Sequence, residues 1–124
     1  MAINARGEDL KALLDMRPDG PVVMLNLLRF RAGGRESYLE YLRLMTEHSL
    51  PRYGGEVVYA GDASNVLIAE PGQAWDFVVM VRYPSREAFS RMVRDPEYQQ
   101  VTTIRTAALE EAVLQATIEL TRPF

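Results

Sequence analysis

Two segments of the chain are apolar at both even and odd positions, and they constrain its fold more than any other feature. Because successive side chains of a β-strand point to opposite faces, residues 22–30 and 75–83 would place apolar groups on both faces of a sheet. A sheet built around these strands must therefore be covered on both sides. The alternating sets are Val22, Met24 and Leu28 against Val23, Leu25 and Leu27, and Phe77, Val79 and Val81 against Val78 and Met80.

Composition narrows the class of protein. The 124 residues fit one domain, and 48% hydrophobic with 25% charged residues is typical of a globular chain rather than a disordered one. A net charge of −3 is a poor match for a phosphate backbone, so we expect no nucleic-acid partner. The absence of cysteine excludes disulfides and thiol nucleophiles, and a single histidine leaves little for a zinc site. We expect no metal and no bound cofactor.

Targeting and membrane signals are missing from the sequence. Glu8 and Asp9 interrupt the N-terminal region, where a secretory signal would need a continuous apolar run. The longest apolar runs, residues 22–25 and 77–81, are too short to cross a bilayer. We therefore expect a cytoplasmic protein without a membrane partner.

Turn and cap residues divide the chain into helices and strands. Pro18 and Pro21 follow a first helix, Pro51 ends a second helix, and Pro84 ends a strand. Ser85 and Asp95 are good N-cap residues, the latter followed by a proline at the first helical position. The expected helices are residues 8–16, 36–50, 86–93 and a helix beginning at 96; the expected strands are residues 22–30, 56–60 resuming at 66–69, 75–83 and 113–120.

Apart from the N-terminal helix, the elements follow the order strand, helix, strand, strand, helix, strand. This order is the ferredoxin-like βαββαβ plan of the α+β class, an antiparallel sheet with both helices on one face. We expect a single domain over residues 1–124, with a helix at 8–16 and a ferredoxin-like core at 21–120. Since the helices cover only one face, the apolar second face predicts a homodimer in which two sheets pack together.

Several local motifs resemble one family of small proteins. They are Gly54-Gly55, Tyr83-Pro84-Ser85, and Asp95-Pro96-Glu97-Tyr98-Gln99 with Arg105 farther along the same helix. Over roughly residues 20–120 the order and spacing of the elements are similar to the DUF1330 family, a domain of unknown function. Two positions depart from it: Glu56 stands where the family usually has arginine, and Met92-Val93 where it often has an aromatic residue.

The resemblance implies a dimeric α+β barrel, in which two ferredoxin-like sheets pack face to face. That superfamily includes cofactor-free monooxygenases of aromatic polyketides and quinols, muconolactone isomerases, haem-dependent peroxidase-like enzymes and members without known activity. The family itself has no agreed catalytic residues, so the resemblance assigns none. Fold alone does not fix function.

His48 and Asn26 are the candidate catalytic residues. Histidine titrates near neutrality, and the spacing of His48 from Tyr41 and Met45 places it at the edge of a buried helix stripe, as a general base would require. The alternative is a half-exposed histidine favoured by the dipole at a helix C-terminus. Asn26 interrupts an apolar strand, where its amide would donate to an oxyanion or be satisfied by the core.

Five further residues are candidates for substrate binding. Arg29 and Arg82 lie on the apolar strands, where they would hold a carboxylate or enolate, or pair with acidic residues at the surface or dimer edge. Tyr41, Trp75 and Tyr98 would form the wall of a ligand pocket, or simply belong to the core.

Two functions stay open at this point. The first is a cofactor-independent enzyme, of a monooxygenase or isomerase kind, acting on a small oxygenated or aromatic molecule. The second is a non-catalytic dimer that binds a small molecule or another protein. A closed cavity containing His48 or Asn26 favours the first, and a solid core favours the second.

Overall fold

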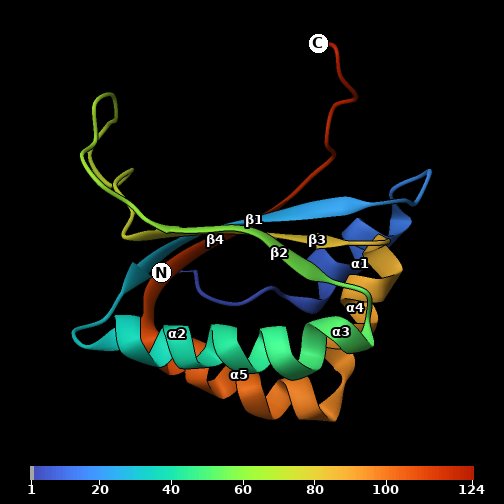
Figure 1. The fold of residues 1–124 in the computed structure, drawn as a ribbon, viewed down its shortest axis with the longest axis horizontal. Coiled ribbons are helices and arrows are strands. Elements are labelled where there is room, and N and C mark those ends of the chain that lie inside the picture. The colour runs from blue at the N-terminus through green and yellow to red at the C-terminus, as the bar shows by residue number, and fades with distance from the viewer. Residues whose placement is uncertain (1) are drawn as a thin grey trace.

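The fold is a four-stranded antiparallel sheet with helices on one face, seen in a computed structural model that describes residues 2–124 (Figure 1). The strand order is β2-β3-β1-β4, which confirms the ferredoxin-like α+β prediction. The strands are β1 (Val22–Phe30), β2 (Glu56–Asp62), β3 (Phe77–Tyr83) and β4 (Leu109–Thr117). The helices are α1 (Gly7–Asp15), α2 (Gly34–Leu44), the π-helical η1 (Met45–Ser49), α3 (Leu50–Arg52), α4 (Arg86–Arg94) and α5 (Pro96–Ala108).

The two central strands divide their side chains between the two faces as their alternating pattern requires. Alternate residues of β1 and β3 are buried against the helices, and the residues between them are half-buried on the opposite face. We call that opposite side the open face. It carries Val23, Leu25 and Leu27 of β1 and Val78, Met80 and Arg82 of β3. No other layer of the described chain covers the centre of this face, and the β2–β3 loop and the C-terminal tail project from the sheet on this side (Figure 1).

The second helix extends beyond both of its expected ends. It begins at Gly34 rather than residue 36 and continues through η1 and α3 to Arg52. Pro51 does not end it, because the change from π-helical to α-helical hydrogen bonding places this proline in the first turn of α3. In a first turn the missing N–H of proline is not needed.

Two predicted strands differ from the structure. Residues 66–69 form part of a loop, since no strand is available to pair with them, and Leu67 and Ile68 are 93% and 97% exposed. The last strand is Leu109–Thr117 rather than residues 113–120. It starts where α5 ends because Leu109 and Ala112 pair with Phe30 and Leu28 in the core, whereas Ile118 and Leu120 lie in the exposed tail.

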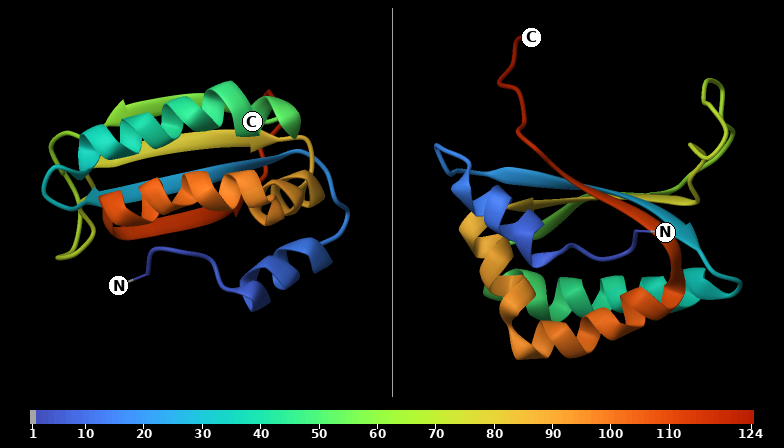
Figure 2. Two further views of the ribbon diagram at one scale, coloured as in Figure 1. Left: turned by 90° about the horizontal axis from the view of Figure 1, so that it is seen from below. Right: turned by 180° about the vertical axis from the view of Figure 1, so that it is seen from behind.

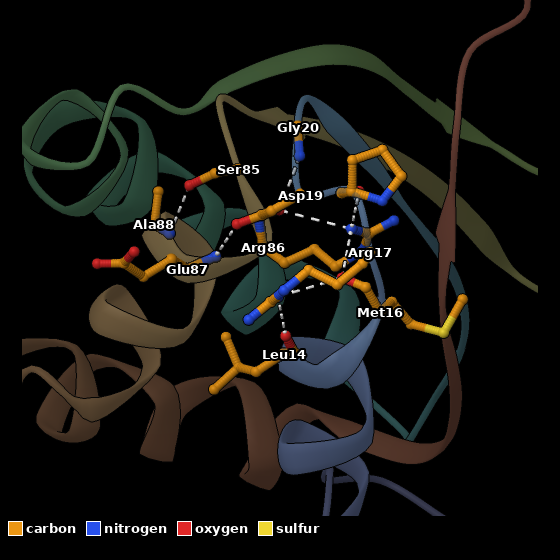
Figure 3. Close-up of polar contacts among 10 residues, drawn as sticks. Leu14, Met16, Arg17, Asp19, Gly20, Ser85, Arg86, Glu87 and Ala88 are labelled. Carbon is orange, nitrogen blue, oxygen red and sulfur yellow. Dashed lines mark hydrogen bonds and ion pairs between the residues drawn. The ribbon is translucent and has the colours of Figure 1, made fainter.

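The segment after α1 is fixed to the N-terminus of α4 (Figure 3). The Asp19 carboxylate accepts hydrogen bonds from the backbone N–H groups of Gly20 at 2.8 Å and Arg86 at 2.9 Å. The buried Arg86 guanidinium donates to the carbonyls of Pro18 at 3.0 Å and Met16 at 3.3 Å. These contacts hold α1 beside the helical layer. Within residues 2–124, no helix combines the length and apolar character needed to cross a membrane.

Candidate functional site

A cavity of about 610 Å³ lies between the helical layer and the sheet. Its apolar lining comes from β1, β3, α4 and η1, including Met24, Val79, Phe89 and Met45. Its polar lining is Asn26, Arg31, four tyrosines (Tyr38, Tyr41, Tyr83 and Tyr98), Gln99, three threonines of α5 and Arg105, with Asn4 from the N-terminal segment. The cavity therefore offers an apolar body with hydrogen-bonding groups, which is the usual composition of a small-molecule site.

The tyrosines of the cavity fall into two groups by their hydrogen bonds. The hydroxyls of Tyr41 and Tyr98 are 2.9 Å apart, and Thr102 donates to Tyr98 at 3.4 Å. Tyr38 and Tyr83, each only 2% exposed, have no side-chain hydrogen bond within residues 2–124. Since no fully enclosed side-chain nitrogen or oxygen lacks a partner in the same residues, both hydroxyls open onto free space.

Burial sets the protonation of these hydroxyls. Desolvation raises the pKa of Tyr38, Tyr41 and Tyr83 well above the ordinary tyrosine range. The positive charge of Arg105 opposes this rise at Tyr38 and Tyr41 but does not cancel it. At neutral pH each hydroxyl therefore keeps its proton and acts as a hydrogen-bond donor.

Asn26 lies on the helix side of β1 and lines the cavity, together with Tyr41 and Tyr98. Its Nδ2 donates long hydrogen bonds of 3.4 Å to the carbonyls of Met24 and Val79. The structure thus brings three of the seven residues proposed from the sequence into one cavity.

His48 lies outside this cavity. Its side chain is 53% exposed and its Nε2 is 3.8 Å from Glu47 Oε2 on the same turn. The lining described here contains no histidine, aspartate or glutamate. The structure therefore does not place His48 where it could act as a base on a molecule bound in the cavity.

Arg29, Trp75 and Arg82 also lie away from the cavity. Arg29 forms an ion pair of 2.6 Å with Glu111, lies 4.3 Å from the Trp75 ring and donates to backbone carbonyls of the β2–β3 loop. Arg82 pairs with Glu56 at 2.7 Å and Glu119 at 2.9 Å. These contacts are the surface pairings that the sequence left as the alternative for both arginines, and they hold the loop and the tail to the open face.

Arg105, Tyr38 and Tyr83 are among the cavity residues that the sequence analysis did not select. Arg105 is 6% exposed, and its Nη1 donates to the Ile3 carbonyl at 2.9 Å and to Asn4 Oδ1 at 3.0 Å. Tyr83 could have been selected from the sequence, because it continues the alternating pattern of buried residues along β3. Arg105 stands out in the sequence as a charged residue on the apolar stripe of a helix. The neighbouring sequence does not reveal that the N-terminal segment binds it.

The N-terminal segment closes one edge of the site. It runs along the β4 side of the sheet (Figure 2), where the N–H of Ala112 donates to the Ala2 carbonyl at 2.8 Å. Asn4, Ala5 and Leu10 line the cavity. Among residues 2–124 there is no cluster of three or more histidine, cysteine, aspartate or glutamate side chains suited to a metal ion.

The sequence matches the model of DUF1330, a domain of unknown function, over residues 27–117. A crystal structure of a protein of unknown function from Rhodopseudomonas palustris is similar over nearly the whole length. Its TM-score is 0.84 at 32% sequence identity, covering 96% of this chain and 97% of that one. No curated protein matches the sequence.

More distant solved structures share the fold. A proposed antibiotic biosynthesis monooxygenase from Bacteroides thetaiotaomicron has a TM-score of 0.60 at 18% identity, covering 82% of this chain and 91% of that one. A DABB-family protein with a ferredoxin-like fold from Mesorhizobium loti has a TM-score of 0.56 at 12% identity, covering 82% and 99%. At these identities the similarity concerns architecture alone.

Proposed function

This chain belongs to the DUF1330 family, and we propose that it is a homodimeric α+β barrel protein whose cavity binds a small aromatic or oxygenated molecule and transforms it without a bound cofactor. The reaction would be of the monooxygenase or isomerase kind. A solved structure named as a proposed antibiotic biosynthesis monooxygenase shares this architecture, and the class of reaction is taken from it as part of the proposal. The substrate site would be the cavity between helices and sheet.

The observation that carries this proposal is the pair of unpartnered hydroxyls on Tyr38 and Tyr83. Both side chains are 2% exposed, yet neither hydroxyl is fully enclosed, so each can donate to a molecule bound in the cavity. A ligand oxygen would satisfy them, with the Asn26 amide nearby as a third polar group. The apolar walls would hold the body of the molecule.

A second candidate function is binding without catalysis. It is favoured by the absence of any aspartate, glutamate or histidine among the described lining residues, since these are the usual general bases. An enzyme built on this cavity would act on substrates that ionise readily, whose anion the protonated tyrosines would stabilise.

A binding and turnover experiment separates the outcomes. Hydroquinones, phenolic acids and lactones are screened by thermal shift, because a ligand of the folded state raises the melting temperature. Hits are then followed for dioxygen uptake and for product formation. Tyr38→Phe should weaken the hit, whereas Tyr59→Phe, which removes an exposed hydroxyl outside the cavity, should not. Turnover supports the enzyme, binding without turnover supports the second candidate, and no hit contradicts both.

We propose that the homodimer forms through the open face. Leu25, Leu27 and Met80 are half-buried apolar residues on that face, and hydrophobic surface of this kind is stabilised by contact with a second copy. Leu67 and Ile68 are almost fully exposed and belong to the β2–β3 loop, which projects from the sheet on the same side (Figure 1). Light scattering coupled to size-exclusion chromatography should give twice the mass of the chain at micromolar concentration.

A further inference from the structure

Arg105 carries a positive charge into the interior of the domain without an acidic partner. It is 6% exposed, and no carboxylate within residues 2–124 lies at ion-pair distance from it. Arg86, the other arginine buried to 6%, has its Nη1 3.5 Å from the Asp19 carboxylate. An unpaired buried charge is strongly unfavourable, so the difference between these two arginines calls for a partner at Arg105 that the chain does not supply.

One edge of the Arg105 guanidinium is left available. Nη1 is engaged by the Ile3 carbonyl and by Asn4 Oδ1, both neutral acceptors. Nε and Nη2 have no hydrogen-bond partner within residues 2–124. These two nitrogens form the side of the planar guanidinium that binds both oxygens of a carboxylate.

The surroundings of Arg105 also favour an anion. Arg31 is a second cation in the lining, and no acidic residue of the described lining balances either charge. The Tyr38 hydroxyl, close enough to feel the Arg105 charge, is a protonated donor that lines the same cavity. Cationic and donor groups in a cavity with apolar walls attract negative charge although the net charge of the chain is −3.

We propose that the molecule bound in this cavity is a small aromatic carboxylate, and that the Nε and Nη2 groups of Arg105 hold its two carboxylate oxygens. The inference rests on the proposed function, because it names the substrate class of the same cavity. Arg105 is then a binding residue, and the N-terminal segment orients its guanidinium by engaging Nη1.

The test compares a carboxylate with its neutral isostere on the full chain. Isothermal titration measures the binding of 2-naphthoate and 2-naphthamide to the parent, Arg105→Gln, Arg105→Lys and the control Arg91→Gln, which makes the same change at an exposed site. The parent should bind the carboxylate about ten- to a hundredfold more tightly than the amide. Arg105→Gln should lose this preference with little change for the amide, Arg105→Lys should keep part of it, and the control should keep all of it.

Three results bear on the inference in different ways. Equal binding of acid and amide to the parent, or an unchanged preference in Arg105→Gln, overturns it and leaves the proposed function standing. Failure of both probes to bind overturns the inference, whereas the proposed function is decided by its own screen of hydroquinones, phenolic acids and lactones. Should Arg105→Gln fail to fold, the parent and Arg105→Lys decide, because an undiminished preference in Arg105→Lys would show that the forked geometry of the guanidinium does not hold the carboxylate.

Discussion

At the scale of single residues, the cavity tyrosines differ in what they contribute to the folded state. Tyr41 has both a buried ring and a hydrogen-bonded hydroxyl, because Tyr98 lies 2.9 Å away. The Tyr38 ring packs 5.9 Å from Phe77 and 5.7 Å from Phe30, yet its hydroxyl has no partner within residues 2–124. A hydroxyl that makes no hydrogen bond within the fold remains free to donate to a ligand.

This difference predicts opposite outcomes for two equivalent changes. Tyr41→Phe should lower the free energy of unfolding by about 1 kcal/mol, because it breaks a buried hydrogen bond and leaves the Tyr98 hydroxyl only its long contact with Thr102. Tyr38→Phe should leave the free energy unchanged or raise it, while weakening any ligand. Urea unfolding measures both. A loss in Tyr38→Phe as large as in Tyr41→Phe would mean that the Tyr38 hydroxyl serves the fold.

His48 illustrates a limit of sequence patterns at the same scale. Regular helical spacing places Ser49 on the stripe of Tyr41 and Met45 and His48 only at its edge. In the structure Ser49 and Leu50 are buried, whereas the His48 side chain is 53% exposed. We expect His48→Ala to change stability by less than about 0.5 kcal/mol and to leave ligand affinity unchanged. Thermal shift with the best hit checks this, and a lost hit would restore His48 as a site residue.

At the scale of elements, local sequence patterns were sufficient to place helices and strands wherever an N-cap residue or an alternating apolar pattern marked them. Residues 22–30 were predicted as a strand and form β1, and the Ser85 and Asp95 side chains accept hydrogen bonds from Ala88 N and Glu97 N as N-caps. The errors lie where tertiary contacts decide the boundary. The start of β4 depends on pairing with Phe30, which no local pattern reveals.

Gly34 joins two elements through a contact that leaves no room for a side chain. A Cβ at this position would overlap the carbonyl oxygen of Ala108, at the junction of α5 and β4. Gly34→Ala should therefore lower the free energy of unfolding by about 1–3 kcal/mol, as overpacking does. Gly20→Ala is the matched control, because nothing lies within 4 Å of the added carbon. Equal stability of the two variants in urea would contradict the close approach.

Asp19 makes the attachment of α4 sensitive to acid. The Arg86 backbone N–H lowers the pKa of this carboxyl, helped by the N–H groups of Gly20 and Glu87 and by the Arg86 charge. Since the folded-state pKa lies below the unfolded one, the contribution to stability is present above the ordinary aspartate pKa of about 3.9. It is lost as the pH falls through the lower folded-state value.

The stability difference between the parent and Asp19→Asn should follow this dependence. It should be largest near neutrality and shrink below about pH 4. Comparing the two proteins removes the effect of other carboxyls that titrate in the same range. Asp15→Asn is the control, because Asp15 forms no ion pair within residues 2–124. A difference that stays constant with pH in urea unfolding would show that the Asp19 charge is not what holds α4.

At the scale of the whole molecule, two-faced strands and element order predicted the α+β architecture, but not the polar end of the cavity. Asn26, Tyr41 and Tyr98 could be selected because they interrupt or join apolar patterns that the sequence displays. Arg105 acquires its role only when residues about a hundred positions away close over it. Contacts of that separation depend on the assembled fold, which a reading of local periodicity does not contain.

The last prediction concerns dimer formation through the open face. Leu25 pairs with Met80 on one side and Gln115 on the other, so it lies on a central strand of that face. In a dimer closed through this face, Leu25→Glu would bury a charge in each copy without a partner. The dimer should weaken by on the order of a hundredfold or more and dissociate at micromolar concentration.

Gln100→Glu on α5 adds the same charge at an exposed position and should leave the dimer intact. Because Leu25 points away from the helices, the monomeric variant should keep its α-helical circular dichroism. A parent protein that is already monomeric, or a Leu25→Glu variant that remains dimeric, would assign the apolar open face to something other than a second copy of this chain. The apolar residues of β1 and β3 on the open face would then still need to be buried, because both faces of these strands are apolar. A different partner would have to bury them.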